Sequence, residues 1–85
     1  MPVHVRFFAS LRRAAGDDGV DIEARTVGDA VRQLKRRFRG NAEFLRFLGI
    51  SNAILNGQNV VFLRGGKTSL ADGDELVFFP PLGGG

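Results

Sequence analysis

Apolar and polar residues alternate near the start of the chain, and this spacing predicts two β-strands. In residues 3–8 the two valines and Phe7 face one side, while the polar positions and Phe8 face the other. Residues 20–24 alternate in the same way. A cluster of turn-forming residues at 15–19 lies between the two stretches. We therefore expect the two strands to form a hairpin.

The spacing of apolar residues becomes helical after residue 25. Thr26 is a plausible N-cap, and Asp29, three residues later, resembles the acidic member of a capping box. Gly40 is a good helix stop. A second, shorter helical turn is expected over residues 43–48. The apolar residues of the main helix share one face: Val27, Ala30, Val31, Leu34 and Phe38.

The remainder of the chain returns to short apolar runs separated by turn residues. Asn56-Gly57 is a strong signal for a hairpin turn, and it separates strands expected over 53–55 and 60–63. Residues 64–69 predict a flexible loop, and the last strand is expected over 75–79. The order ββ-α-ββ-β predicts an α+β domain in which a mixed sheet wraps over one main helix.

The last strand could pair with the first in the middle of this sheet. Its alternation places Leu76 and Phe78 on one face and Val77 and Phe79 on the other. Phe8 and Phe79 would then lie side by side on the face away from the helix. Two exposed phenylalanines there would form a docking patch. The alternative is that a loop buries both rings.

Composition narrows the classes of function. The chain has 85 residues, which is the size of one domain, and 44% of them are hydrophobic. It contains no cysteine, which excludes disulfides, thiolate metal sites and a cysteine nucleophile. The net charge of +3, with ten arginines among twelve basic residues, is weak evidence for a nucleic-acid or acidic protein partner. Since no signal peptide or membrane span is recognisable, we expect a cytoplasmic protein.

Few residues suggest catalysis by the domain itself. His4 is the only histidine, and its place in a strand favours a surface position over the role of a base. The acidic residues at 72–75 resemble a turn more than a metal site. Residues 64–67, Arg-Gly-Gly-Lys, lack the glycine spacing and the following helix of a phosphate-binding loop. We therefore expect neither a metal site nor a cofactor bound by this chain.

The end of the sequence is its most informative feature. An apolar strand runs directly into Pro80-Pro81-Leu82-Gly83-Gly84-Gly85. Prolines block further strand pairing, and glycines make a thin, pliable segment with an unhindered carboxylate. We predict a domain over residues 1–81 and a flexible tail over 82–85 that threads into a narrow channel of another protein. The alternative is an ordinary frayed terminus.

These features together resemble the MoaD/ThiS family. Residues 5–12, Val-Arg-Phe-Phe-Ala-Ser-Leu-Arg, are similar to its first strand, and residues 26–30 to its helix start. Asn56-Gly57 after a short apolar strand also fits. The most specific similarity is residues 70–81, Leu-Ala-Asp-Gly-Asp-Glu-Leu-Val-Phe-Phe-Pro-Pro, followed by the terminal Gly84-Gly85. The Phe-Phe-Pro-Pro form is most similar to the small subunit of molybdopterin synthase.

The resemblance implies a β-grasp, ubiquitin-like fold and the role of a sulfur carrier without catalytic residues of its own. In this family an E1-like enzyme of MoeB/ThiF type, which binds ATP and Mg²⁺, adenylates the terminal glycine, here Gly85. Sulfur from a persulfide donor then replaces AMP to leave a thiocarboxylate. A large subunit of MoaE type uses that sulfur to build the molybdopterin dithiolene.

The resemblance, together with the pattern above, assigns roles to named residues. Gly85 is the expected site of adenylate, thiocarboxylate or isopeptide formation, and Gly83 and Gly84 are the expected threading segment. Partner contacts are expected at Phe8, Arg12, Phe79, Pro80, Pro81 and Leu82. Two departures from the family stand out: Gly83 occupies a position where a larger residue is common, and the 64–69 loop is longer than in compact members.

Two other functions are compatible with parts of this pattern. A ubiquitin-like modifier would share the adenylate but join Gly85 to lysines of target proteins. A basic nucleic-acid-binding module would not need the glycine tail, and the phenylalanines do not alternate with arginines as stacking platforms do. Among sulfur carriers, thiazole formation, tRNA thiolation and cysteine synthesis are alternatives to molybdopterin.

Overall fold

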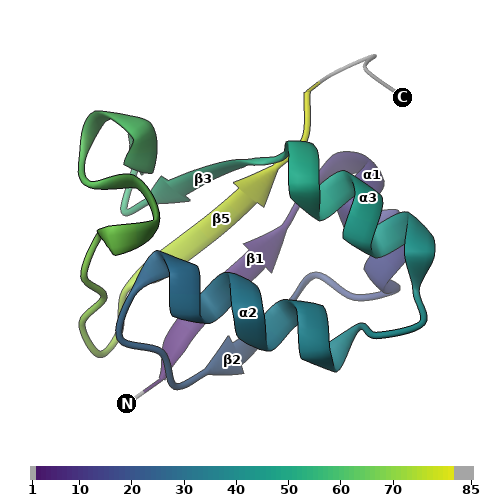
Figure 1. Cartoon of the computed structure of the whole chain (residues 1–85), viewed down its shortest axis with the longest axis horizontal. Helices are drawn as coiled ribbons and strands as arrows, with labels where there is room; N and C mark the ends of the chain where they lie inside the picture. Colours follow the sequence, from purple (N-terminus) through teal and green to yellow (C-terminus); the bar gives the residue numbers. More distant parts are fainter. Residues whose placement is uncertain (1, 82–85) are drawn as a thin grey trace.

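The first and last strands meet in the middle of one mixed sheet. The computed structural model describes residues 2–81. Within it β1 runs parallel to β5, and the strand order is β2-β1-β5-β3-β4 (Figure 1). The other neighbouring pairs are antiparallel. This confirms the predicted pairing of the first strand with the last. The strands are β1 (Val3–Phe7), β2 (Gly19–Ile22), β3 (Asn52–Leu55), β4 (Gln58–Asn59) and β5 (Glu75–Phe79).

Helices cover one face of the sheet. Figure 1 shows α2 crossing in front of the strands, with α3 beside it. Of the helices between residues 2 and 81, none combines the length and apolar character that a membrane span requires. The helical elements are α1 (Ala9–Ala15), α2 (Val27–Arg37), α3 (Ala42–Ile50) and the 3-10 turns η1 (Val60–Phe62) and η2 (Gly65–Lys67).

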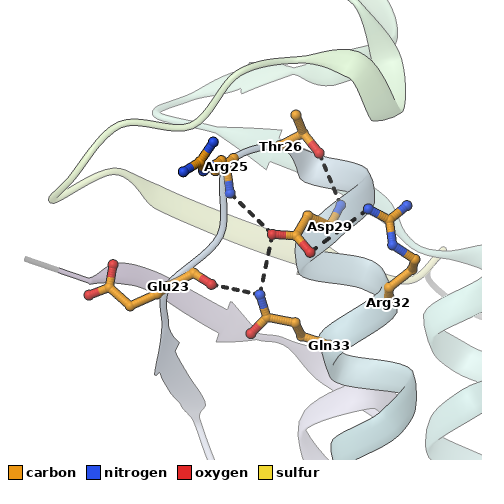
Figure 2. Close-up of polar contacts among 6 residues, drawn as sticks. All are labelled: Glu23, Arg25, Thr26, Asp29, Arg32 and Gln33. Carbon is orange, nitrogen blue, oxygen red and sulfur yellow. Dashed lines mark hydrogen bonds and ion pairs between the residues drawn. The ribbon is translucent and has the colours of Figure 1, made fainter.

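The start of α2 follows the predicted capping signals with one variation (Figure 2). Thr26 Oγ1 accepts a hydrogen bond from the Asp29 N–H at 3.1 Å, as an N-cap should. The Asp29 carboxylate accepts from the N–H of Arg25, one residue before the cap, at 3.2 Å. Gln33 Nε2 donates to the Glu23 carbonyl at 2.6 Å and links the helix to the segment before it. These bonds fix the path of the chain from the end of β2 to the start of α2.

The core lies between the helices and the inner face of the sheet. Val27, Ala30 and Leu34 of α2 are buried, as the helical spacing predicts, while Val31 and Phe38 are half-buried. Phe44 of α3 is fully buried, stacked on Phe38 at 3.8 Å between ring centroids. The rings of Phe44 and Phe7 are nearly perpendicular, with their centroids 5.2 Å apart. The helical turn expected over 43–48 is present as the longer helix α3, Ala42–Ile50. Through Phe44, this helix contributes to the centre of the core.

The connection between the first two strands is not a simple hairpin. β1 and β2 pair antiparallel as expected, but α1 lies between them and was not predicted. No side chain caps its start, and Ala9 has a positive φ of 54°. Gly16 closes the helix in the left-handed conformation, donating its N–H to the Arg12 carbonyl. Gly16 therefore terminates a helix rather than contributing only to a turn.

Residues 60–63 do not form the predicted strand. The Asn56-Gly57 hairpin turn is present, with φ of 47° and 89°, but β4 has only two residues. The chain then enters η1, where the Val61 N–H donates a hydrogen bond to Asn59 Oδ1 at 3.0 Å. This side-chain bond, together with burial of Val60, favours a 3-10 turn over continued pairing.

The segment 64–69 is also more ordered than the flexible loop that was expected. It contains η2, and Thr68 is buried. The Thr68 carbonyl accepts from the Val27 N–H at 3.0 Å, and Thr26 forms a bridge with Ser69. The segment is thus held against the start of α2.

Candidate partner-docking site at the end of β5

The central feature of the site is a pair of stacked phenylalanines. Because β1 and β5 are parallel neighbours with Phe7 opposite Phe78, Phe8 and Phe79 lie side by side at the carboxyl ends of these strands. Their ring centroids lie 5.7 Å apart with an interplanar angle of 19°. The side chains are 38% and 37% exposed, so no loop buries them. The predicted adjacency and exposure are confirmed, while contact with a partner stays a prediction.

The two prolines after β5 have different environments. Pro80 is fully buried and Pro81 is exposed. The Pro80 ring therefore packs inside the domain and offers no surface to a partner. This burial is at odds with the partner contact expected for Pro80 from the sequence. Leu82, Gly83, Gly84 and Gly85 lie outside the described residues, as does the predicted tail as a whole.

Helix α1 carries two arginines in its last turn. It begins directly after Phe8, and its buried Leu11 packs it against the core. Arg12 Nε contacts Asp18 Oδ1 at 2.7 Å, and both side chains are more than half exposed. Arg12 is therefore paired with Asp18 but still accessible to solvent, and its contact with a partner stays a prediction. Arg13 is exposed as well.

Two further residues border the site and were not singled out from the sequence. Asn52 of β3 lies opposite Phe79 in the register, and Ile50 at the end of α3 is 46% exposed. Both depend on the antiparallel pairing of β3 with β5, which sets the end of α3 beside the end of the last strand. Only their position next to a strand expected near 53 could have signalled them.

The other candidate groups have structural roles. His4 Nδ1 lies 2.8 Å from Asp21 Oδ1 on the sheet surface, at the end of β1 opposite to Phe8. Asp74 accepts hydrogen bonds from Asn56 and from the Ala71 N–H. Glu75 pairs with Arg6 at 3.1 Å. These contacts agree with the surface histidine and the acidic turn inferred from the sequence.

The fold and the site define a ubiquitin-like domain of the β-grasp type, with an α+β architecture and an exposed aromatic pair where the last strand ends. The chain matches the ThiS family over residues 5–85 and belongs to it. This is the family of MoaD/ThiS ubiquitin-like proteins, whose members are sulfur carriers or modifiers.

Three relatives illustrate the range of this family. Small archaeal modifier protein 3 from Haloferax volcanii is 40% identical over 93 residues, with both chains covered completely. Small archaeal modifier protein 1 from Methanosarcina acetivorans is 30% identical with a TM-score of 0.81, covering 98% of this chain and 95% of that one. In Helicobacter pylori, the complex of subunits 1 and 2 of molybdopterin-converting factor contains a chain that is 26% identical. It has a TM-score of 0.71, and both chains are covered completely.

Proposed function

We propose that this protein is a sulfur carrier that acts in the cytoplasm and holds sulfur as a thiocarboxylate on Gly85. The observation that carries the proposal is the exposed Phe8–Phe79 pair beside the buried Pro80. An aromatic surface at the root of a glycine tail suits a protein that docks by its sheet and delivers its terminus into a partner's site. The sequence after Pro81 supplies only thin residues and the reacting carboxylate.

The proposed chemistry requires an E1-like enzyme of MoeB/ThiF type that binds ATP and Mg²⁺. The Gly85 carboxylate attacks the α-phosphorus of ATP, and pyrophosphate leaves. A persulfide sulfur then attacks the acyl carbon, AMP leaves, and an acyl disulfide forms. A second thiol of the activating system reduces that disulfide and releases the thiocarboxylate. The enzyme must exclude water because the acyl adenylate hydrolyses readily.

Molybdopterin synthesis is the acceptor reaction that we propose. The Phe78-Phe79-Pro80-Pro81 ending supports it, and so does the similarity to a chain in the complex of subunits 1 and 2 of molybdopterin-converting factor. The partner would be a large subunit of MoaE type, which would take the sulfur for the dithiolene. Thiazole formation, tRNA thiolation and cysteine synthesis are the alternative acceptor reactions.

A modifier function is the second candidate. It is favoured by the 40% identity to small archaeal modifier protein 3. In this case a lysine amine of a target protein attacks the Gly85 acyl group, AMP leaves, and an isopeptide bond forms. The adenylation step is shared, so the two candidates differ only in which nucleophile displaces AMP.

Deletion of Gly84 and Gly85 tests the step common to both. We expect the variant to lose ATP-dependent adenylation by the E1-like enzyme, measured as pyrophosphate release, with an unchanged thermal midpoint. Gly83→Ala is the matched control and should retain most of the adenylation rate, because members of the family commonly have a larger residue at this position. Adenylation that persists without both glycines would contradict the proposed role of the tail.

A further inference from the structure

A second exposed apolar surface lies on the opposite edge of the sheet from β2. We call Val61, Phe62 and Leu63 the η1 knuckle. Phe62 is 85% exposed, Val61 70% and Leu63 39%. Single exposed apolar residues are ordinary on protein surfaces, but three consecutive large ones form a patch that usually marks an interaction site.

The η1 knuckle is held in place by its neighbours. Val60 is buried directly before it, and the Leu63 N–H donates to the Val60 carbonyl at 2.9 Å. After it, the Arg64 N–H donates to Thr68 Oγ1 at 3.0 Å, and Thr68 is itself buried. Phe62 is therefore exposed on a turn whose backbone is held in place by hydrogen bonds on both sides. A surface fixed in this way loses little conformational entropy when a partner covers it.

Cations border the η1 knuckle on the side of η2. Arg64 and Lys67 are exposed and form no ion pair with another residue between 2 and 81. η2 packs against the first turn of α2, where a Cβ added to Gly28 would lie 3.1 Å from the Gly66 carbonyl oxygen and 3.8 Å from Arg32 Nη1. Residues 60–69 contain no acidic residue. Charge complementarity therefore favours a partner with carboxylates around an apolar socket.

Two asparagines on the outer face of the sheet, Asn52 and Asn59, connect the η1 knuckle to the Phe8–Phe79 pair. Phe79 lies opposite Asn52 in the register, so their side chains share the outer face. Asn59 Nδ2 donates to Asn52 Oδ1 at 3.4 Å, and Asn59 Oδ1 accepts from the Val61 N–H. β4 is two strands from β5, or about 10 Å. One partner face of ordinary size can therefore cover both apolar surfaces.

We propose that the η1 knuckle is a second docking anchor for the E1-like adenylating enzyme, which would accept Phe62 in an apolar socket rimmed by carboxylates facing Arg64 and Lys67. This inference rests on the proposed function, because the enzyme is the partner that both the carrier and the modifier routes require. Contact at two separated points fixes the rotation of the domain about its tail, and a single aromatic pair does not.

The test is the kinetics of adenylation with full-length Phe62→Ser. We expect the KM for this protein to rise about tenfold or more with kcat nearly unchanged, since the η1 knuckle does not touch the reacting carboxylate. Because Phe62 is so exposed, the thermal midpoint should not fall. Arg64→Glu should raise KM most at low salt, whereas Arg37→Glu, an equal charge change in the last turn of α2, should not.

The remaining outcomes separate the possible occupants. An unchanged KM for both Phe62→Ser and Arg64→Glu, with a wild type that is adenylated normally, overturns the anchor and leaves the proposed function standing. A wild type that is not adenylated overturns the proposed function itself. The anchor is also overturned if Phe62→Ser leaves KM unchanged but abolishes sedimentation with phosphatidylserine vesicles, or abolishes a dimer seen by ultracentrifugation.

Discussion

Phe79 shows how one residue can serve both the fold and an interface. Its backbone belongs to β5 and pairs with Asn52, while its ring stacks on Phe8 and is still one-third exposed. The next residue, Pro80, is buried. Phe79 and the buried Pro80 directly precede the segment 82–85 that we predict to be the tail, so a partner that contacts Phe79 would bind next to that segment.

Phe79→Arg should weaken binding to the E1-like enzyme about tenfold or more, because a charge replaces an aromatic contact at the centre of the patch. The cost in unfolding free energy should be about 1 kcal/mol or less, since the ring is partly exposed and the Arg stem can cover Phe8. Titration calorimetry and urea unfolding measure the two effects. A dissociation constant equal to that of the wild type would remove Phe79 from the interface.

At the scale of elements, alternation and capping signals predicted what they physically control. The faces of β1 and β5, the N-cap of α2 and the Asn56-Gly57 turn depend on local spacing, and all are present. α1 was missed because no side chain caps it. The run at 60–63 was wrongly assigned to a strand because its β-branched residues favour extended structure, whereas the Asn59 side chain caps a 3-10 turn.

Glycines in two elements give a matched prediction of stability. A Cβ at Gly19 of β2 would lie 2.0 Å from the Val5 carbonyl oxygen, so Gly19→Ala must displace backbone and should cost about 1–3 kcal/mol. Gly49 of α3 has open space around its Cβ position, so Gly49→Ala should gain about 0.5–1 kcal/mol. Urea unfolding compares both with the wild type. Equal stabilities of the two variants would contradict the close approach of β2 to β1.

At the scale of the whole molecule, the two faces of the sheet have different tasks. The inner face packs on the helices and forms the core. The outer face carries polar contacts along β1, a hydrogen bond between His4 and Asp21 and an ion pair between Arg6 and Glu75, and becomes apolar where β1 and β5 end. Under the proposed function, this gradient would give a docking partner one preferred orientation, with Phe8 and Phe79 inside the contact.

Much of this site was predictable from the sequence. The adjacency of Phe8 and Phe79 follows from alternation once the chain ends pair in the middle of the sheet. The η1 knuckle was not predictable in the same way, because the exposure of Phe62 depends on how Val60 and Thr68 are buried by distant segments. The burial of Pro80 likewise depends on tertiary packing that spacing alone does not reveal.

The most direct test of the central claim is the intact mass of the full chain after incubation with the E1-like enzyme, ATP and a persulfide donor, followed by fragmentation of the C-terminus. We predict a mass gain equal to the replacement of one oxygen by sulfur, located on Gly85. Fragmentation is essential because oxidation of Met1 produces nearly the same gain. An unaltered Gly85 carboxylate, in the presence of an enzyme shown to activate a related carrier, would contradict the account.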